Sequence, residues 1–339
     1  MPLRYGSETA EHQAVRHAAG LFDLSHMGEI RLTGPGAGAA LDYALTGYLS
    51  TLRPGRARYT MICAPDGGVL DDLVVYRQGE QEFLVIANAA NTAVVYGELR
   101  SRSAGYDAAV SDATADYALI AIQGPAAAGI LGPLVSMDLG AMKYYTGAFG
   151  DVAGRPAWVA RTGYTGEDGF EVFGQPSDAV HVWEALASAG TSAGLLPAGL
   201  AARDTLRLEA GMPLYGNELG PDLTPFEAGL GRVVRFDKPG DFVGRPALAA
   251  RASAGPRREL VGLTLRSRRV ARHGYPVFAD GIQAGTVTSG APSPTLGQPI
   301  AMAYLTAGTG ARNAVLTVGI RGETVPAQLT ELPFYSRSR

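Results

Sequence analysis

Apolar and polar residues alternate with two different periods along the first 236 residues, which predicts a mixture of helices and strands. Helical spacing that stops near a glycine predicts helices over 9–19, 92–102, 179–188 and 200–210. Period-two or continuous apolar runs predict strands over 29–32, 58–63, 69–76, 83–87, 117–122 and 170–173. We find no internal repeat.

The pattern changes near residues 237–245, where closely spaced strands replace the mixture. After a short helix, six apolar runs follow with turn residues between nearly all of them, at 260–265, 277–278, 285–289, 300–305, 314–320 and 324–329. About one hundred residues of this kind predict an all-β barrel or sandwich. The chain is therefore predicted to be α+β, followed by a β domain.

Two neighbouring aspartates lie in the predicted strand 69–76. Alternation places Asp71 with Leu73 and Val75 on one face, and Asp72 with Val74 and Tyr76 on the other. A carboxylate that shares a face with a valine and a tyrosine is typical of a pocket wall. A pair of aspartates facing water at a strand end explains the pattern equally well.

The stretch Arg161–Glu171 is the most concentrated group of chemically active residues. Gly163, Gly166 and Gly169 predict tight turns with positive φ. The strand after them places Glu171 on one face, where a carboxylate could meet a ligand. A charged surface hairpin is an equally good interpretation of composition alone.

Composition narrows the function classes. The chain has 339 residues, enough for two or three domains, with 46% hydrophobic residues and a formal charge of −3. A basic excess is absent, so the chain does not read as a nucleic-acid binder. Cys63 is the single cysteine, which rules out an intrachain disulfide. The sequence has no apolar run of membrane length and no signal peptide at its start, so we expect a cytoplasmic protein.

Several common chemistries find no support. The five histidines are scattered and one cysteine cannot build a metal cluster, so no metal is expected. His26 is interpreted as a structural histidine rather than a base. The glycine run from Gly34 to Gly38 lacks the third glycine of a dinucleotide loop, and no Walker or G-x-S-x-G motif occurs. The remaining carboxylates, arginines and tyrosines suit a polar heteroaromatic ligand.

Eight motifs in one order resemble the glycine cleavage system T proteins, the aminomethyltransferases, and most closely those of actinobacterial type. They are Ser25–Met27, Gly67–Asp72, Val85–Asn88, Gln123–Pro125, Arg161–Glu171, Gly199–Gly211, Leu214–Asn217 and Thr288–Gly297. The resemblance covers nearly the whole chain. Family members usually carry an extra opening segment that ends in Gly-Trp-x-Met-Pro, whereas this chain starts at Met1-Pro2, so we expect a shortened amino terminus.

The resemblance implies a three-lobed ring around a central folate channel. Two mixed α/β lobes would form residues 1–236, one from about 1–30 with 113–236 and the other from 31–112, and a β-barrel domain would form 237–339. The implied reaction moves an aminomethyl group from the lipoyl arm of a partner, the H protein, to tetrahydrofolate. Ammonia and 5,10-methylenetetrahydrofolate would be the products.

The resemblance also implies roles for individual residues. Asp72 matches the catalytic carboxylate, Glu171 the carboxylate that binds the pterin, and Arg203 a site arginine. Further folate-channel positions are matched by Met27, Tyr59, Tyr76, Asn88, Tyr144 and Tyr164. Candidates for the folate glutamate tail are Arg232, Arg235 and Lys238, although Arg232 stands where some members have tryptophan.

Two other functions remain open on the sequence. A tetrahydrofolate-dependent demethylase on the same scaffold would differ in the pocket for the one-carbon donor. A non-catalytic folate-binding protein would need a cysteine-bearing motif, and Cys63 lies outside any such motif.

Overall fold

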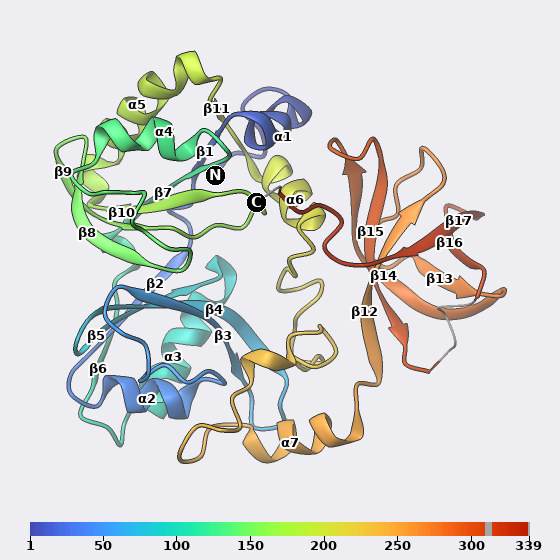
Figure 1. Cartoon of the computed structure of the whole chain (residues 1–339). Coiled ribbons are helices and arrows are strands. Elements are labelled where there is room, and N and C mark those ends of the chain that lie inside the picture. Colours follow the sequence, from blue (N-terminus) through green and yellow to red (C-terminus); the bar gives the residue numbers. More distant parts are fainter. Residues whose placement is uncertain (309–313, 338–339) are drawn as a thin grey trace.

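Three lobes make up the chain in the computed structural model, which describes residues 1–308 and 314–337. Two lobes are built on open sheets with helices, and the third is a closed six-stranded barrel. The lobes meet around the chain that follows helix α6 (Leu200–Glu209) (Figure 1). The predicted architecture, α+β with a carboxy-terminal barrel, is confirmed.

The first sheet has six strands in the order β11-β1-β7-β10-β9-β8. Its strands are β1 (Gly20–Asp23), β7 (Ala118–Gln123), β8 (Gly147–Val152), β9 (Arg155–Ala160), β10 (Gly169–Gly174) and β11 (Leu196–Pro197). Helices α4 (Ala127–Leu131) and α5 (Ala179–Gly190) pack on one face, where Ile122, Phe170 and Leu186 are buried together. Helix α1 (Glu8–His17) packs against α6.

The second sheet has five strands in the order β3-β4-β5-β2-β6. Its strands are β2 (Gly28–Thr33), β3 (Arg56–Cys63), β4 (Val69–Gly79), β5 (Glu82–Ala87) and β6 (Ala109–Asp112). Helices α2 (Ala37–Ala44) and α3 (Thr92–Arg102) cover its outer face. The apolar side chains of α2, among them Ala37 and Leu41, are buried there, and the helix predicted over 92–102 has those bounds.

The two sheets share one topology. In each, a strand runs through a Gly-Pro step into a helix: β2, Gly34-Pro35 and α2, then β7, Gly124-Pro125 and α4. Gly34 and Gly124 have φ of 118° and 133°, which only glycine adopts easily. The strand order β3-β4-β5-β2 then matches β8-β9-β10-β7. The two sheets thus repeat one strand order and one short motif, a similarity of topology that the apolar pattern of the sequence did not reveal.

The inner faces of the two sheets bury a common core. Tyr76 and Leu84 of the second sheet are packed with Phe22 and Phe173 of the first. The rings of Tyr76 and Phe173 are 5.6 Å apart at 70°, an edge-to-face contact. The face of β4 that carries Asp72 and Tyr76 therefore turns toward the other sheet, while Leu73 and Val75 face α2 and α3. The water-facing interpretation of the aspartate pair is thereby wrong.

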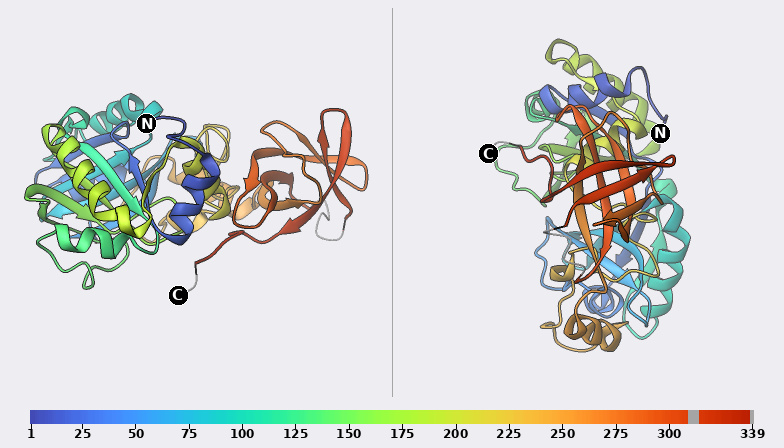
Figure 2. Two further views of the ribbon diagram at one scale, coloured as in Figure 1. Left: turned by 90° about the horizontal axis from the view of Figure 1, so that it is seen from above. Right: turned by 90° about the vertical axis from the view of Figure 1, so that its right-hand side faces the viewer.

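The barrel lies to one side of the two-sheet body (Figure 2). Its strands are β12 (Arg258–Leu265), β13 (Pro276–Ala279), β14 (Ile282–Ser293), β15 (Gln298–Thr306), β16 (Leu316–Ile320) and β17 (Glu323–Thr330). Leu208 of α6 packs on Ile300 and Met302 of the barrel. Helix α7 (Arg245–Ala254), between the predicted domain junction and the barrel, instead packs through Leu248 against β3 and β4.

A buried ion-pair network joins α1, α6 and the barrel. Glu209 accepts hydrogen bonds from Arg16 (Nη2 at 2.9 Å, Nε at 3.0 Å) and from Thr295 Oγ1 at 2.8 Å, and His12 Nε2 is 3.2 Å away. Arg16 also donates from Nη1 to the carbonyl of Thr165 at 2.7 Å, and this bond ties it to the glycine-rich loop. Burial alone would raise the pKa of Glu209, but hydrogen bonds and charge from His12 and Arg16 lower it to about 2. Glu209 is thus a charged anchor between lobes.

Glu29 in β2 is a second buried carboxylate, with the opposite electrostatics. It is 1% exposed, and its carboxylate oxygens have no hydrogen-bond partner among the described residues. Burial, reinforced by the charge of Asp112, raises its pKa to about 8 from 4.5. Glu29 is therefore protonated in the folded protein at neutral pH, whereas it is ionised in the unfolded chain.

This difference predicts a pH-dependent effect of Glu29→Gln. Because the folded pKa is raised, the stability linked to Glu29 is present below pH 4.5 and is lost as the pH rises toward 8. The glutamine variant should therefore equal the wild type near pH 4.5 and exceed its unfolding free energy by roughly 1–2 kcal/mol at pH 8, allowing for water penetration. Urea unfolding at several pH values measures this. A variant less stable than the wild type at pH 8 would contradict it.

Candidate active site

One cavity of about 340 Å³ opens between the two sheets. Every residue that lines it lies between Met27 and Leu230. All nine site residues singled out from the sequence are among them: Met27, Tyr59, Asp72, Tyr76, Asn88, Tyr144, Tyr164, Glu171 and Arg203. The volume falls in the range of sites for small ligands. The fold therefore brings together side chains that are up to 176 positions apart in the sequence.

Asp72 of β4 is held by two hydrogen bonds at one end of this cavity. Its Oδ1 accepts from Asn88 Nδ2 at 2.8 Å, and its Oδ2 accepts from the Tyr59 hydroxyl at 3.0 Å. Burial raises the pKa of Asp72 above its ordinary value, and the hydrogen bonds from Tyr59 and Asn88 oppose that rise. A carboxylate with raised proton affinity in a fixed orientation is suited to take up a proton.

Asp71 supports Asp72 from the opposite face of the strand. It is fully buried, and it accepts from the Asn88 backbone at 3.0 Å and from Asn88 Nδ2 at 2.8 Å. Asn91 Nδ2 donates to it at 2.7 Å. Burial raises the pKa of Asp71 to about 6 despite these bonds. The Asn88 amide therefore bridges both aspartates, and Asp71 fixes the donor that orients Asp72.

Glu171 of β10 presents one fixed and one free oxygen to the cavity. Its Oε2 accepts from the Tyr76 hydroxyl at 3.1 Å and from the Thr162 hydroxyl. Among the described residues, no donor contacts Oε1. Phe170 and Val172, on either side of Glu171, are buried in the other core, so strand alternation turns the carboxylate toward the cavity. The surface-hairpin interpretation of this stretch is wrong at Glu171.

The glycines of this loop are required mainly for close packing. Only Gly166 has positive φ, at 83°. A Cβ on Gly163 would lie 2.0 Å from Gln123 Oε1, and one on Gly169 would lie 2.5 Å from Gln123 Nε2. The expectation of three positive-φ turns is therefore wrong at two positions. Gln123 Nε2 also donates to the carbonyl of Thr162 at 3.0 Å, so the loop is wrapped around this side chain.

Arg203 of α6 places a cation in the same cavity. Its guanidinium carbon lies 4.8 Å from the centre of the Tyr164 ring, and Tyr164 donates its hydroxyl to the carbonyl of Pro213. Within the described residues, the Arg203 guanidinium makes no ion pair and no hydrogen bond. Its five N–H donors are therefore available to an acceptor on a ligand.

Comparison with known proteins identifies the family. Residues 1–238 match the model described as GCVT N-terminal domain, and residues 258–336 match the glycine cleavage T-protein C-terminal barrel domain. The chain belongs to the glycine cleavage T-protein family. An aminomethyltransferase of Saccharopolyspora erythraea is 61% identical over 339 residues, covering all of this chain and 92% of the relative. An aminomethyltransferase of Streptomyces avermitilis is 61% identical over 343 residues with the same coverage.

A solved structure agrees with these matches. The glycine cleavage system aminomethyltransferase T from Bartonella henselae superposes with a TM-score of 0.91 at 35% identity, covering 99% of this chain and 91% of that one. The predicted resemblance is confirmed, and this T-protein family member is an aminomethyltransferase. The relatives support that function and not the demethylase alternative.

Other predicted site residues of this T-protein chain have different surroundings. The Lys238 ammonium, an expected contact of the glutamate tail, donates to the carbonyls of Asp42, Leu45 and Gly47 in the interior. It is a structural cation and is not free to hold a ligand. Arg235 pairs with Asp237 at 2.6 Å on the surface. His26 is solvent-exposed, but neighbouring atoms partly desolvate its ring, and this desolvation together with the charge of Arg203 lowers its pKa.

The sequence missed a group of cavity residues on irregular segments. They are Tyr145, Thr162, Gly163, the segment 211–215 and Leu230, besides apolar strand residues. The run Gly211–Tyr215 follows α6 without alternation or helical spacing, so no periodic signal marks it.

Within residues 1–308 and 314–337, no cluster of three metal-ligating side chains occurs. In that same part of the chain, no helix has the length and apolarity needed to cross a membrane.

Proposed function

We propose that this T-protein chain transfers the aminomethyl unit from the lipoyl arm of the H protein to tetrahydrofolate, releasing ammonia and forming 5,10-methylenetetrahydrofolate. One observation carries the proposal. Asp72, whose pKa is raised, lines the same cavity as Glu171, which has one carboxylate oxygen without a donor, and Arg203, whose guanidinium has no acidic partner among the described residues. The family assignment supports the same reaction. A cytoplasmic location is part of the proposal.

The polar groups of the cavity fit a reduced pterin. Its 2-amino group and ring N–H are neighbouring donors, which the carboxylate of Glu171 can accept as a fork. Arg203 supplies donors for a carbonyl or a carboxylate of the same ligand. The tyrosines and Met27 offer ring faces and apolar surface. Tetrahydrofolate is thus proposed as the acceptor bound between Glu171, Arg203 and Asp72.

Asp72 is proposed to act as general base and to orient the folate. The N5 nitrogen forms a bond to the one-carbon unit, the carbon–sulfur bond breaks, and the sulfur stays on the lipoyl arm as a thiolate that takes up a proton from solvent. N10 then bonds to the same carbon, the carbon–nitrogen bond breaks, and the proton that N10 loses leaves with that nitrogen as ammonia. Asp72 takes the proton that N5 loses, and its bonds from Tyr59 and Asn88 keep its lone pairs aimed. Holding the reacting atoms together supplies a large further part of the acceleration.

Product analysis tests the proposal. Purified protein is incubated with aminomethyl-lipoyl H protein, with and without tetrahydrofolate, and ammonia and methylenetetrahydrofolate are measured. Folate-dependent release of both is the expected result. Folate binding without any ammonia release, together with turnover of a methylated donor, would overturn it in favour of the demethylase.

Glu171→Gln tests the pterin contact. The amide replaces a charged acceptor by a neutral group, and one of its ends donates instead of accepting. We expect tetrahydrofolate affinity to fall about 10- to 100-fold, the effect of losing charge-assisted hydrogen bonds. Fluorescence titration measures the dissociation constant, with Glu80→Gln as the matched control because Glu80 is exposed. Unchanged affinity in Glu171→Gln would remove Glu171 from the binding site.

A further inference from the structure

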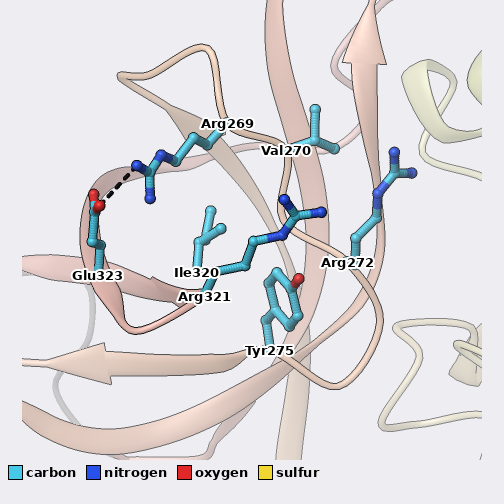
Figure 3. Close-up of a pocket in the computed structure, with 7 residues that line it drawn as sticks. All are labelled: Arg269, Val270, Arg272, Tyr275, Ile320, Arg321 and Glu323. Carbon is cyan, nitrogen blue, oxygen red and sulfur yellow. Dashed lines mark hydrogen bonds and ion pairs between the residues drawn. The ribbon is translucent and has the colours of Figure 1, made fainter.

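A second cavity, of about 430 Å³, lies on the barrel and is separate from the folate cavity. It opens between the loop that joins β12 to β13 and the tip of the β16–β17 hairpin (Figure 3). Its lining residues are Arg269, Val270, Arg272, Tyr275, Ile320, Arg321 and Glu323. None of them lines the cavity between the sheets. The proposed transfer reaction gives this pocket no role.

The pocket carries a net positive charge in a chain that is negative overall. Three guanidinium groups meet one carboxylate there, a net of two positive charges, against −3 for the chain. Arg269 pairs with Glu323 at 2.8 Å, and Arg272 donates only to the Gly290 carbonyl, at 3.4 Å. In the described part of the chain, Arg321 has neither an ion pair nor a hydrogen bond. Its guanidinium projects into the pocket beside the loop that carries Tyr275 (Figure 3).

The backbone of Arg321 gives an independent indication. Ile320 and Glu323 are paired across the hairpin, so Arg321 and Gly322 form a two-residue turn with φ of 51° and 83°. Such turns favour asparagine, aspartate or glycine at the first position. The neighbouring β13–β14 hairpin follows this rule with Asp280 and Gly281. A long side chain in this left-handed conformation strains the turn, which is a reason to look for a function of the side chain.

We propose that this barrel pocket is an oxyanion-binding site for a group with at least two negative charges. Arg321 is the principal donor, and the remaining N–H groups of Arg269 and Arg272 complete the site. Guanidinium forks match phosphate oxygens and carboxylates equally well. The shared chemistry is a multiply charged oxyanion, whether it is free in solution as phosphate or presented as neighbouring carboxylates on a protein segment.

Arg321→Asn is the decisive variant because asparagine suits the turn and removes the charge. Inorganic phosphate and a triglutamate peptide are titrated separately by calorimetry at constant ionic strength set with chloride. The wild type is expected to bind at least one of them, and Arg321→Asn to bind it at least 10-fold more weakly. The unliganded variant is expected to melt at the same temperature as the wild type or above it. Arg100→Gln, an exposed helix arginine, is the control and should bind as the wild type.

The outcomes separate the alternatives. Tighter binding of triglutamate identifies carboxylates of a protein segment as the ligand, and tighter binding of phosphate identifies a free anion. The proposal is overturned if neither phosphate nor triglutamate gives the wild type more binding heat than chloride does. It is also overturned if Arg321→Asn binds the ligand with the affinity of the wild type. Arg272→Gln is the second variant and should weaken the same titration without altering the turn.

Discussion

Asp72→Asn is expected to lower turnover by about 10²- to 10⁴-fold, the contribution of a positioned general base. The substitution keeps the shape of the side chain, so tetrahydrofolate should bind with an affinity within about threefold of the wild type. The remaining amide oxygen can still accept from Asn88 Nδ2, and the new amide NH2 can donate to the oxygen of the Tyr59 hydroxyl. Single-turnover rates and equilibrium titration measure the two quantities separately.

The pH profile of the same variant provides its control. Asp72 must be ionised to accept a proton, so wild-type turnover should fall as the pH drops through the pKa of Asp72. That pKa is raised by burial, so the decline should begin above the range of a free aspartate. Asp72→Asn should lose this acid limb altogether. An unchanged limb, or full turnover in the variant, would assign the proton acceptor to another group.

Glu209→Gln is expected to lower the unfolding free energy by about 3–5 kcal/mol, as is typical when one partner of a buried ion pair is removed. Among the described residues, Arg16 would then keep only Glu167 as a buried acidic partner, and His12 would lose its contact with a carboxylate. The contacts from Thr295 and Ser293 would also weaken, and with them the junction of the barrel to α6. Denaturant unfolding, followed by both circular dichroism and tryptophan fluorescence, measures the loss.

The acid dependence of the wild type gives a second measure of Glu209. Its folded pKa is depressed, so the stability that it contributes is present above pH 4.5 and is lost as the pH falls toward 2. Glu209→Gln should therefore flatten the acid side of the stability curve. Glu8→Gln, at an exposed position of α1, should change stability by at most about 0.5 kcal/mol. A loss of similar size in both variants would mean that the network contributes little.

The sequence was informative where one element carries both its own signal and the functional residue. Alternation in 69–76 separated Asp72 from Asp71, and β4 keeps that separation because each of its faces is buried in a different core. The same logic placed Glu171. The family motifs then identified nine candidate site residues, and the fold brings all nine together in one cavity.

The remainder depends on contacts between distant segments, which local patterns do not encode. Thr162 belongs to the site because its hydroxyl lies 2.8 Å from the hydroxyl of Tyr76, which is 86 positions earlier and in the second sheet. Gly163 and Gly169 must lack a Cβ because the side chain of Gln123, which lies in the neighbouring strand β7, packs against both of them. Lys238 looks like a ligand contact in the sequence, yet it donates to three carbonyls from the end of α2 and the loop after it. Such roles become visible only once the chain is folded.

The matching order of the two sheets also has a consequence for the two acids of the cavity. Leu84 pairs with the residue three places before Gly34, and Glu171 with the residue three places before Gly124, so the two are equivalent positions. By the same register Tyr76 is equivalent to Ala160, and Asp72 to Pro156. Each sheet thus contributes one acid, and the equivalent position of the other sheet holds an apolar residue. Neither sheet contains both acids, so the pair is brought together only where the two sheets face each other.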